Sequence, residues 1–157
     1  MEFRALLDAF SAAVEAGDGD GFSALFAEDG VYHDHFYGDF KGRTAIRGLL
    51  VEKFHGDGDS FHWRFHDEAL AGTGTGYASF RYAFSSKSER ARGSRVALSG
   101  MSRFRLREGL IHDYDDAFEG GIMLSQLGTP GEAMAKIFAR WSQRALKDPQ
   151  LRRLMED

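Results

Sequence analysis

Two acidic stretches carry the side chains that could do chemistry in this chain. In VYHDHFYGDF, residues 31–40, Asp34 lies between two histidines, with Tyr32 and Phe36 two positions away on either side. Because side chains alternate along a strand, Tyr32, Asp34 and Phe36 would share one face. A carboxylate walled by aromatic rings is partly desolvated, which raises its pKa toward the range of a general acid or base. Asp34 is therefore a candidate catalytic residue, although an exposed carboxylate on an edge strand would explain the same pattern.

The second acidic stretch is HDYDDAFEG, residues 112–120, near the end of a strand-like run. Two carboxylates from different strands that face each other across a pocket form a general acid–base arrangement. A two-residue turn at 108–109 with strict alternation would place Asp113 and Asp115 on the inner face. A single β-bulge would instead turn a different set inward: Tyr114, Asp116 and Phe118.

The two histidines beside Asp34 raise the question of a metal site. His33 and His35 would share the strand face opposite Asp34, and imidazoles two residues apart on a strand can converge. A zinc or iron site needs a third and often a fourth donor. No spacing connects the remaining histidines to this pair. We therefore predict no metal site and expect both rings on the solvent or subunit-contact face.

Composition limits the class of protein. The chain has 157 residues, a net charge of −4, no cysteine and 14 phenylalanines. The mild charge indicates no nucleic-acid partner, and the absence of cysteine excludes disulfides and thiolate chemistry. The apolar runs are too short to cross a membrane, and the start of the sequence does not resemble a secretory signal. We therefore expect a soluble cytoplasmic protein whose core or cavity is walled with aromatic rings.

Hydrophobic spacing predicts the elements that position these residues. Apolar residues recur at helical spacing from Phe3 to Val14, and the pattern stops at Gly17. A short helix from about residue 20, a strand over 31–37 and a helix over 44–54 follow. Four strands in two hairpins come next, at 61–70, 77–84, 95–106 and 110–118. Helical segments close the chain. This order predicts an α+β domain in which the helices cover one face of a curved sheet and leave a pocket between the layers.

The order and several local motifs resemble the nuclear transport factor 2-like superfamily. FSALFAEDGVYHDHFYGDFKGRTAIRGLL is similar to its helix–strand–helix segment, FRLREGLIHDYDDAF to its closing hairpin, and FEGGIMLSQLG to the tail of SnoaL-like polyketide cyclases. The resemblance implies one domain over 1–157, with a cone over 1–128 and a C-terminal helical extension over 129–157. The cone would be a mixed, mostly antiparallel sheet wrapped around the N-terminal helices, as in cystatin-like folds. It also implies a homodimer formed through the outer sheet face.

Comparison with ketosteroid isomerase, a member of this superfamily, places Asp34 on that family's proton-shuttling aspartate. Phe10 and Ser102 lie where that enzyme has the tyrosine and the protonated aspartate that hold the enolate oxygen. Phenylalanine cannot donate a hydrogen bond and serine is the weaker donor, so steroid isomerase activity is not expected. The same comparison favours the bulged register of the last strand, with Asp116 facing the cavity.

Two functions follow from the pattern and the resemblance. The first is a cofactor-free isomerase, cyclase or hydratase-type enzyme that acts on a small, hydrophobic, oxygenated molecule. Its catalytic residues would be Asp34, Asp116 and Tyr114, and its substrate-binding residues would be Phe10, Tyr32, Phe36, Ser102 and Phe118. The alternative is a non-catalytic ligand-binding or dimerisation module of the same fold.

Overall fold

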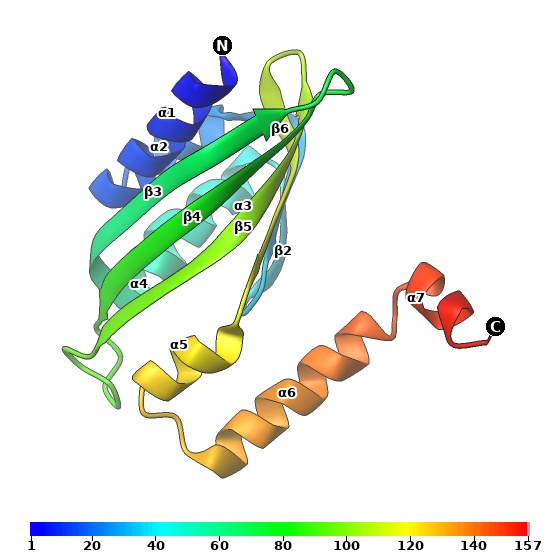
Figure 1. The fold of residues 1–157 in the computed structure, drawn as a ribbon. Coiled ribbons are helices and arrows are strands. Elements are labelled where there is room, and N and C mark those ends of the chain that lie inside the picture. The colour runs from blue at the N-terminus through cyan, green and yellow to red at the C-terminus, as the bar shows by residue number, and fades with distance from the viewer. Residues whose placement is uncertain (157) are drawn as a thin grey trace.

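A curved sheet of six strands wraps around the N-terminal helices in the computed structural model, which describes residues 1–156 (Figure 1). The strand order is β2-β1-β6-β5-β4-β3, and all neighbouring strands are antiparallel except β1 and β6, which are parallel. The strands are β1 (Phe26–Asp34), β2 (Gly38–Lys41), β3 (Gly58–Leu70), β4 (Thr75–Ser86), β5 (Arg95–Arg107) and β6 (Leu110–Phe118). The predicted α+β class with a mixed, mostly antiparallel sheet is confirmed.

Helix α1 (Phe3–Ala16) supplies the apolar face that closes the narrow part of the cone. Its predicted stripe from Phe3 to Val14 is buried, and it packs against β3. The helix ends at Gly17, whose φ of 68° lies in the left-handed region that glycine adopts without penalty. The short helix α2 (Gly19–Ala24) follows and leads into β1.

The closing hairpin decides which side chains of β6 face inward. Glu108 and Gly109 both have positive φ, 54° and 76°, which is the backbone of a two-residue turn between β5 and β6. Leu106 then pairs with Ile111, but Arg105 pairs with Asp113, so one extra residue is inserted into β6. This is the bulge that reverses the alternation beyond it. The inner side chains of β6 are consequently Tyr114, Asp116 and Phe118, and the bulged alternative is the one observed.

Strand β1 ends three residues earlier than the sequence predicts. It stops at Asp34, and residues 35–37 form a turn before β2. The prediction of a strand over 31–37 is therefore wrong for its last three residues. As a consequence, strict alternation does not govern where the side chains of His35 and Phe36 point.

The segment after β2 forms one wall of the wide end of the cone. It consists of α3 (Arg43–Gly48), the π-helical segment η1 (Leu49–Phe54) and α4 (His55–Asp57). Ile46, Leu49 and Leu50 are fully buried, as the predicted helix over 44–54 requires. Phe54, the last residue of η1, and Asp57, the last residue of α4, both line the cavity. Short π-helical segments are frequent at functional sites.

Three helices follow the sheet: α5 (Gly120–Gln126), α6 (Gly131–Ala145) and α7 (Pro149–Leu154). The Gln126 side chain fastens α5 to β5 through the backbone N and O of Ala97, at 2.8 and 3.0 Å. Helix α6 has no buried residue and runs past the end of the sheet rather than along it (Figure 1). None of the helices in residues 1–156 is long and apolar enough to cross a membrane.

Candidate functional site

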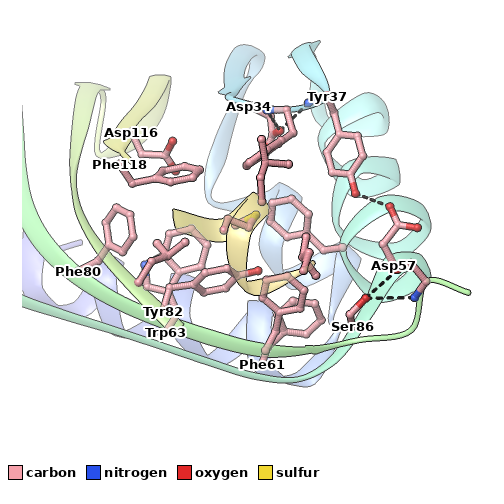
Figure 2. Close-up of a pocket in the computed structure, with 18 of the residues that line it drawn as sticks. Asp34, Tyr37, Asp57, Phe61, Trp63, Phe80, Tyr82, Ser86, Asp116 and Phe118 are labelled. Atoms are coloured by element: carbon pink, nitrogen blue, oxygen red, sulfur yellow. Dashed lines mark hydrogen bonds between the residues drawn. The ribbon is translucent and has the colours of Figure 1, made fainter. Parts of the chain in front are cut away.

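A cavity of about 330 Å³ opens at the wide end of the cone, between the inner face of the sheet and the helices η1, α4 and α5 (Figure 2). Ten aromatic side chains form most of its wall. Its carboxyl groups belong to Asp34, Asp57 and Asp116, and the lining contains no lysine, arginine or histidine. The site is therefore an apolar pocket with a few acidic groups, which is a common composition for a small-molecule site.

Asp34 is held at the end of β1 by the turn that follows it. Its Oδ1 accepts hydrogen bonds from the backbone N–H groups of Phe36 and Tyr37, both at 2.8 Å. Burial raises the pKa of this carboxyl above its ordinary value, while the two amides and the charge of Arg144 act in the opposite direction. The aromatic surroundings inferred from sequence thus have their expected effect. The amides fix the orientation of the carboxylate.

Asp116 faces the same cavity from β6, as the labels in Figure 2 show. Burial, together with the negative charge of Asp34, raises the pKa of Asp116 to about 8. A hydrogen bond from Tyr114 lowers it only in part. Asp116 is therefore mainly protonated at neutral pH, so it can donate a hydrogen bond or a proton.

Tyr114 and Ser102 form a buried hydrogen-bonded chain behind Asp116. The Ser102 Oγ lies 2.9 Å from the Tyr114 hydroxyl, which donates to Oδ2 of Asp116 at 3.2 Å. Both side chains are completely buried, and neither lines the cavity. Burial raises the pKa of Tyr114 far above its ordinary value, so the phenol stays neutral. Tyr114 thus reaches the cavity only through Asp116.

Phe10 also lies outside the cavity. Its ring packs at 5.2 Å from the ring of Tyr114 and at 4.9 to 6.0 Å from four further rings, those of Phe22, Trp63, Phe65 and Phe104. The substrate-binding roles predicted for Phe10 and Ser102 therefore find no support in their positions, because large rings fill the narrow part of the cone up to Tyr114. Ser102 instead contacts the Tyr114 hydroxyl, and Phe10 packs against the Tyr114 ring.

Three predicted binding residues do line the cavity: Tyr32, Phe36 and Phe118. Tyr32 and Phe118 point inward by strand alternation, whereas Phe36 reaches the cavity from the turn after β1. The structure thus brings together Asp34, Asp116 and three of the aromatic side chains in one site.

Several lining residues were missed by sequence reasoning. Phe61 and Trp63 alternate along β3, and Tyr82 lies on the neighbouring strand β4. The alternating pattern in FHWRF would have identified the first two. A hydrogen bond from the Tyr37 hydroxyl to Asp57 Oδ2 joins the β1–β2 turn to α4 at the cavity (Figure 2). No sequence signal predicts this pair, because both residues lie outside regular strands.

The two histidines diverge instead of forming a pair. His33 lies on the outer face of the sheet, where its ring nitrogens contact Asp39 at 2.8 Å and Asp113 at 3.1 Å. His35 instead packs against Phe118 and against Trp141 of α6, which corrects the prediction that it shares an open face with His33. Within residues 1–156, no group of three or more potential ligands is placed to hold a metal ion.

The remaining acidic residues of β6 lie on the outer face. Asp115 forms an ion pair with Arg103 at 2.6 Å, and Asp113 lies 3.6 Å from the same guanidinium. Asp113, Asp115 and Arg103 therefore have ion-pair partners on the outer face and need no role in the cavity.

Comparison with known proteins identifies the family. Residues 7–114 match the model of the SnoaL-like domain, which is more than half of the chain. The chain belongs to the SnoaL-like domain family. Among curated proteins, no sequence matches it.

Solved structures with the same fold share the cone of this SnoaL-like chain. A protein from Catenulispora acidiphila with a ketosteroid isomerase-like fold, in complex with trimethylamine, has a TM-score of 0.71 at 23% identity. The match covers 81% of this chain and 95% of that protein. An LEH-like epoxide hydrolase from M. tuberculosis has a TM-score of 0.64 at 19% identity, covering 87% and 94%. A SnoaL-like polyketide cyclase candidate from Shewanella putrefaciens has a TM-score of 0.67 at 17% identity, covering 81% and 96%. These likenesses establish the fold.

The SnoaL-like match ends at Tyr114, so Asp116 and the C-terminal helices lie beyond it.

Proposed function

We propose that this SnoaL-like protein is a general acid–base enzyme that uses Asp34 and Asp116 on a small, hydrophobic, oxygenated substrate. The observation that supports it best is the pairing of two carboxyl groups in one aromatic cavity, with the pKa of Asp116 raised to about 8 by burial and by the charge of Asp34. Two carboxyl groups whose pKa values are driven apart by their surroundings can divide the acid and base roles between them.

The division of roles follows from the hydrogen bonds. Asp34 receives two backbone amides, which favour its ionised form, so it is the better base. Asp116 keeps its proton at neutral pH, so it is the better acid. Asp34 would remove a proton from a carbon, or from a water molecule, while Asp116 donates to the oxygen on which charge develops. Tyr114 would keep Asp116 in place through its hydroxyl.

The wall of the cavity favours a neutral, largely apolar substrate. The ionised carboxylate of Asp34 would repel an anion, and no basic side chain among the lining residues compensates. The volume of about 330 Å³ lies at the lower end of the range for small-molecule sites. We therefore expect ketones, enones or epoxides with few polar groups. The proposed chemistry needs neither a metal nor an organic cofactor.

Steroid isomerisation by the arrangement of ketosteroid isomerase is not proposed. At the position of the first oxyanion-binding residue, Phe10 has no donor and is enclosed by rings. The Ser102 hydroxyl is hydrogen-bonded to the Tyr114 hydroxyl and does not reach the cavity. In this protein, Asp116 would take the place of that oxyanion hole.

The test is a turnover screen on small ketones, enones and epoxides, followed by three variants at matched conditions. We expect Asp34→Asn and Asp116→Asn each to reduce kcat by about 10²-fold or more, as removal of a positioned acid or base does. The control Asp115→Asn alters the outer-face neighbour of Asp116 and should retain activity. Ligand binding without turnover would favour the alternative of a non-catalytic binding module. Turnover that survives both cavity variants would overturn the roles proposed for Asp34 and Asp116.

The same proposal includes a homodimer formed through the outer sheet face. On β5 the outward side chains are Ala97, Ser99, Met101, Arg103 and Arg105. Met101 is 51% exposed on this otherwise small and polar face. Light scattering of the wild type and of Met101→Glu would test this: we expect a dimer that the added charge weakens. A wild-type monomer at micromolar concentration would contradict it.

A further inference from the structure

Helix α6 docks on the turn that orients Asp34. The indole of Trp141 lies 4.5 Å from the His35 ring and 5.2 Å from the Phe36 ring, measured between centroids. A Cβ atom at Gly120 would come within 2.6 Å of the indole, so the absence of a side chain there makes room for it. The indole therefore occupies a fitted site between the turn and the start of α5.

Arg144, three residues further along α6, contacts the same turn. Its Nη1 donates a hydrogen bond to the backbone oxygen of His35 at 3.2 Å. The N–H of that same peptide unit, carried by Phe36, donates to Oδ1 of Asp34 at 2.8 Å. One peptide group thus accepts from a guanidinium on one side and donates to the carboxylate on the other. A donor to the carbonyl strengthens the N–H as a donor, because hydrogen bonds in a chain polarise one another.

We propose that α6 is a functional part of the cavity site and that Arg144 is a positioning residue, which acts on Asp34 through the His35–Phe36 peptide group. Arg144 does not line the cavity, so it need not touch a substrate. Its role is to hold the turn and to favour the ionised form of the carboxyl group. Whether this role affects catalysis rests on the function proposed for Asp34. The hydrogen bond of Arg144 to the turn is observed independently of that proposal.

The charges around Asp34 single out Arg144. The other ionisable side chains that interact with this carboxyl lie on β1, β4, β6 and the turn, and they are acids or phenols: Tyr32, Tyr82, Asp116 and Tyr37. His35 lies beside it, but burial and the charge of Arg144 lower the pKa of that ring, so it is neutral at neutral pH. Arg144 is the cation that opposes the effect of burial on Asp34.

Helix α6 lies beyond the family match, which ends at Tyr114. A helix with no buried residue has little reason to be fixed by packing alone. The insertion of Trp141 and the hydrogen bond of Arg144 give α6 a defined position at the carboxylate turn. The C-terminal extension thereby supplies a charge that tunes the base.

The test is an NMR titration of the ¹³C-labelled carboxyl group of Asp34 in the full-length protein. Arg144→Met should move the Asp34 titration to higher pH, since loss of a nearby cation disfavours the ionised form. His35 should shift upward as well. Arg144→Lys should restore part of the difference, and added salt should reduce it. The control is Arg140→Met, which removes the same charge one turn earlier from an exposed position of α6.

The outcomes separate this inference from the proposed function. An Asp34 titration that is the same in the wild type and in Arg144→Met, or one that Arg140→Met shifts equally, would overturn the role of Arg144. If the titration shifts as expected but no substrate is turned over, the positioning role stands and the enzymatic proposal fails. If the protein is active, Arg144→Met should move the acidic limb of its kcat–pH profile to higher pH. At pH values above that limb, the kcat of the variant should equal that of the wild type.

Discussion

Asp116 should cost the protein stability at neutral pH. Its pKa is about 8 in the folded protein, against an ordinary value of 3.8. Between these two pH values the folded state holds a proton that the unfolded state has released. Stability therefore falls as pH rises from about 4 to about 8, where this loss is complete. Replacement of Asp116 by asparagine, which is neutral and keeps an oxygen for the Tyr114 hydroxyl, removes the penalty.

The magnitude follows from the separation of the two pKa values. At pH 7 the unfolded carboxyl lies about 3.2 pH units above its pKa of 3.8, which corresponds to about 4 kcal/mol of stability at 1.36 kcal/mol per unit. Asp116→Asn should therefore stabilise the protein by up to about 4 kcal/mol at pH 7 and by almost nothing at pH 4. For a chain of this size, that is a rise in Tm of roughly 10 °C at neutral pH.

The assay is urea unfolding of the wild type and Asp116→Asn at pH values between 4 and 8.5. Asp115→Asn is the matched control, because this neighbour lies on the outer face in an ion pair with Arg103. Loss of this ion pair should lower the free energy of unfolding by no more than about 1 kcal/mol, as for other partly exposed pairs. The reasoning fails if Asp116→Asn and the wild type have parallel stability curves across this range. We expect Asp116→Asn to be more stable than the wild type but inactive, because catalytic groups are often retained at a cost in stability.

Three further changes test the core, the hydrogen-bonded chain and the outer face. Tyr114→Phe removes the hydrogen bond that lowers the pKa of Asp116, so the ¹³C titration of Asp116 should move to higher pH. Phe10→Ala should destabilise the protein by about 3–5 kcal/mol in urea unfolding, because its ring is fully buried. Burial acts against the charged form of His33, but the hydrogen bonds of its two aspartate partners outweigh it, so its pKa is raised above 6.5. Its stabilising contribution is complete below pH 6.5 and is lost as pH rises through the folded pKa, and His33→Gln should remove this dependence.

Much of the fold could be predicted because its periodicities are strong. The stripe from Phe3 to Val14 has helical spacing, and the strands of the two hairpins alternate between apolar and polar residues. The turn at Glu108 and Gly109 has a two-residue form that the sequence indicates directly. These local patterns agree with the final packing, so tertiary contacts had nothing to override.

The site was less predictable because it lies where these patterns are interrupted. The bulge before Asp113 moves Asp116 from the outer face to the cavity, and alternation alone could only leave the two registers open. The end of β1 at Asp34 sends His35 toward α6, although a continuous strand would place it beside His33. Arg144 carries no signal at all, since its contact with the turn joins residues 109 positions apart.

These interruptions also explain how the site holds two carboxyl groups inside an aromatic cone. A regular strand offers each side chain only the inner or the outer face, whereas a strand end exposes backbone amides that are free to bind a carboxylate. Asp34 uses two such amides, and therefore tolerates burial as an anion better than a carboxylate in the middle of a strand would. Asp116 lies within a strand and has only the Tyr114 hydroxyl, so it keeps its proton instead. Burial raises the pKa of both carboxyl groups, but the two amides oppose this at Asp34, and the charge of Asp34 raises the pKa of Asp116 further. The division between base and acid depends on this difference in pKa.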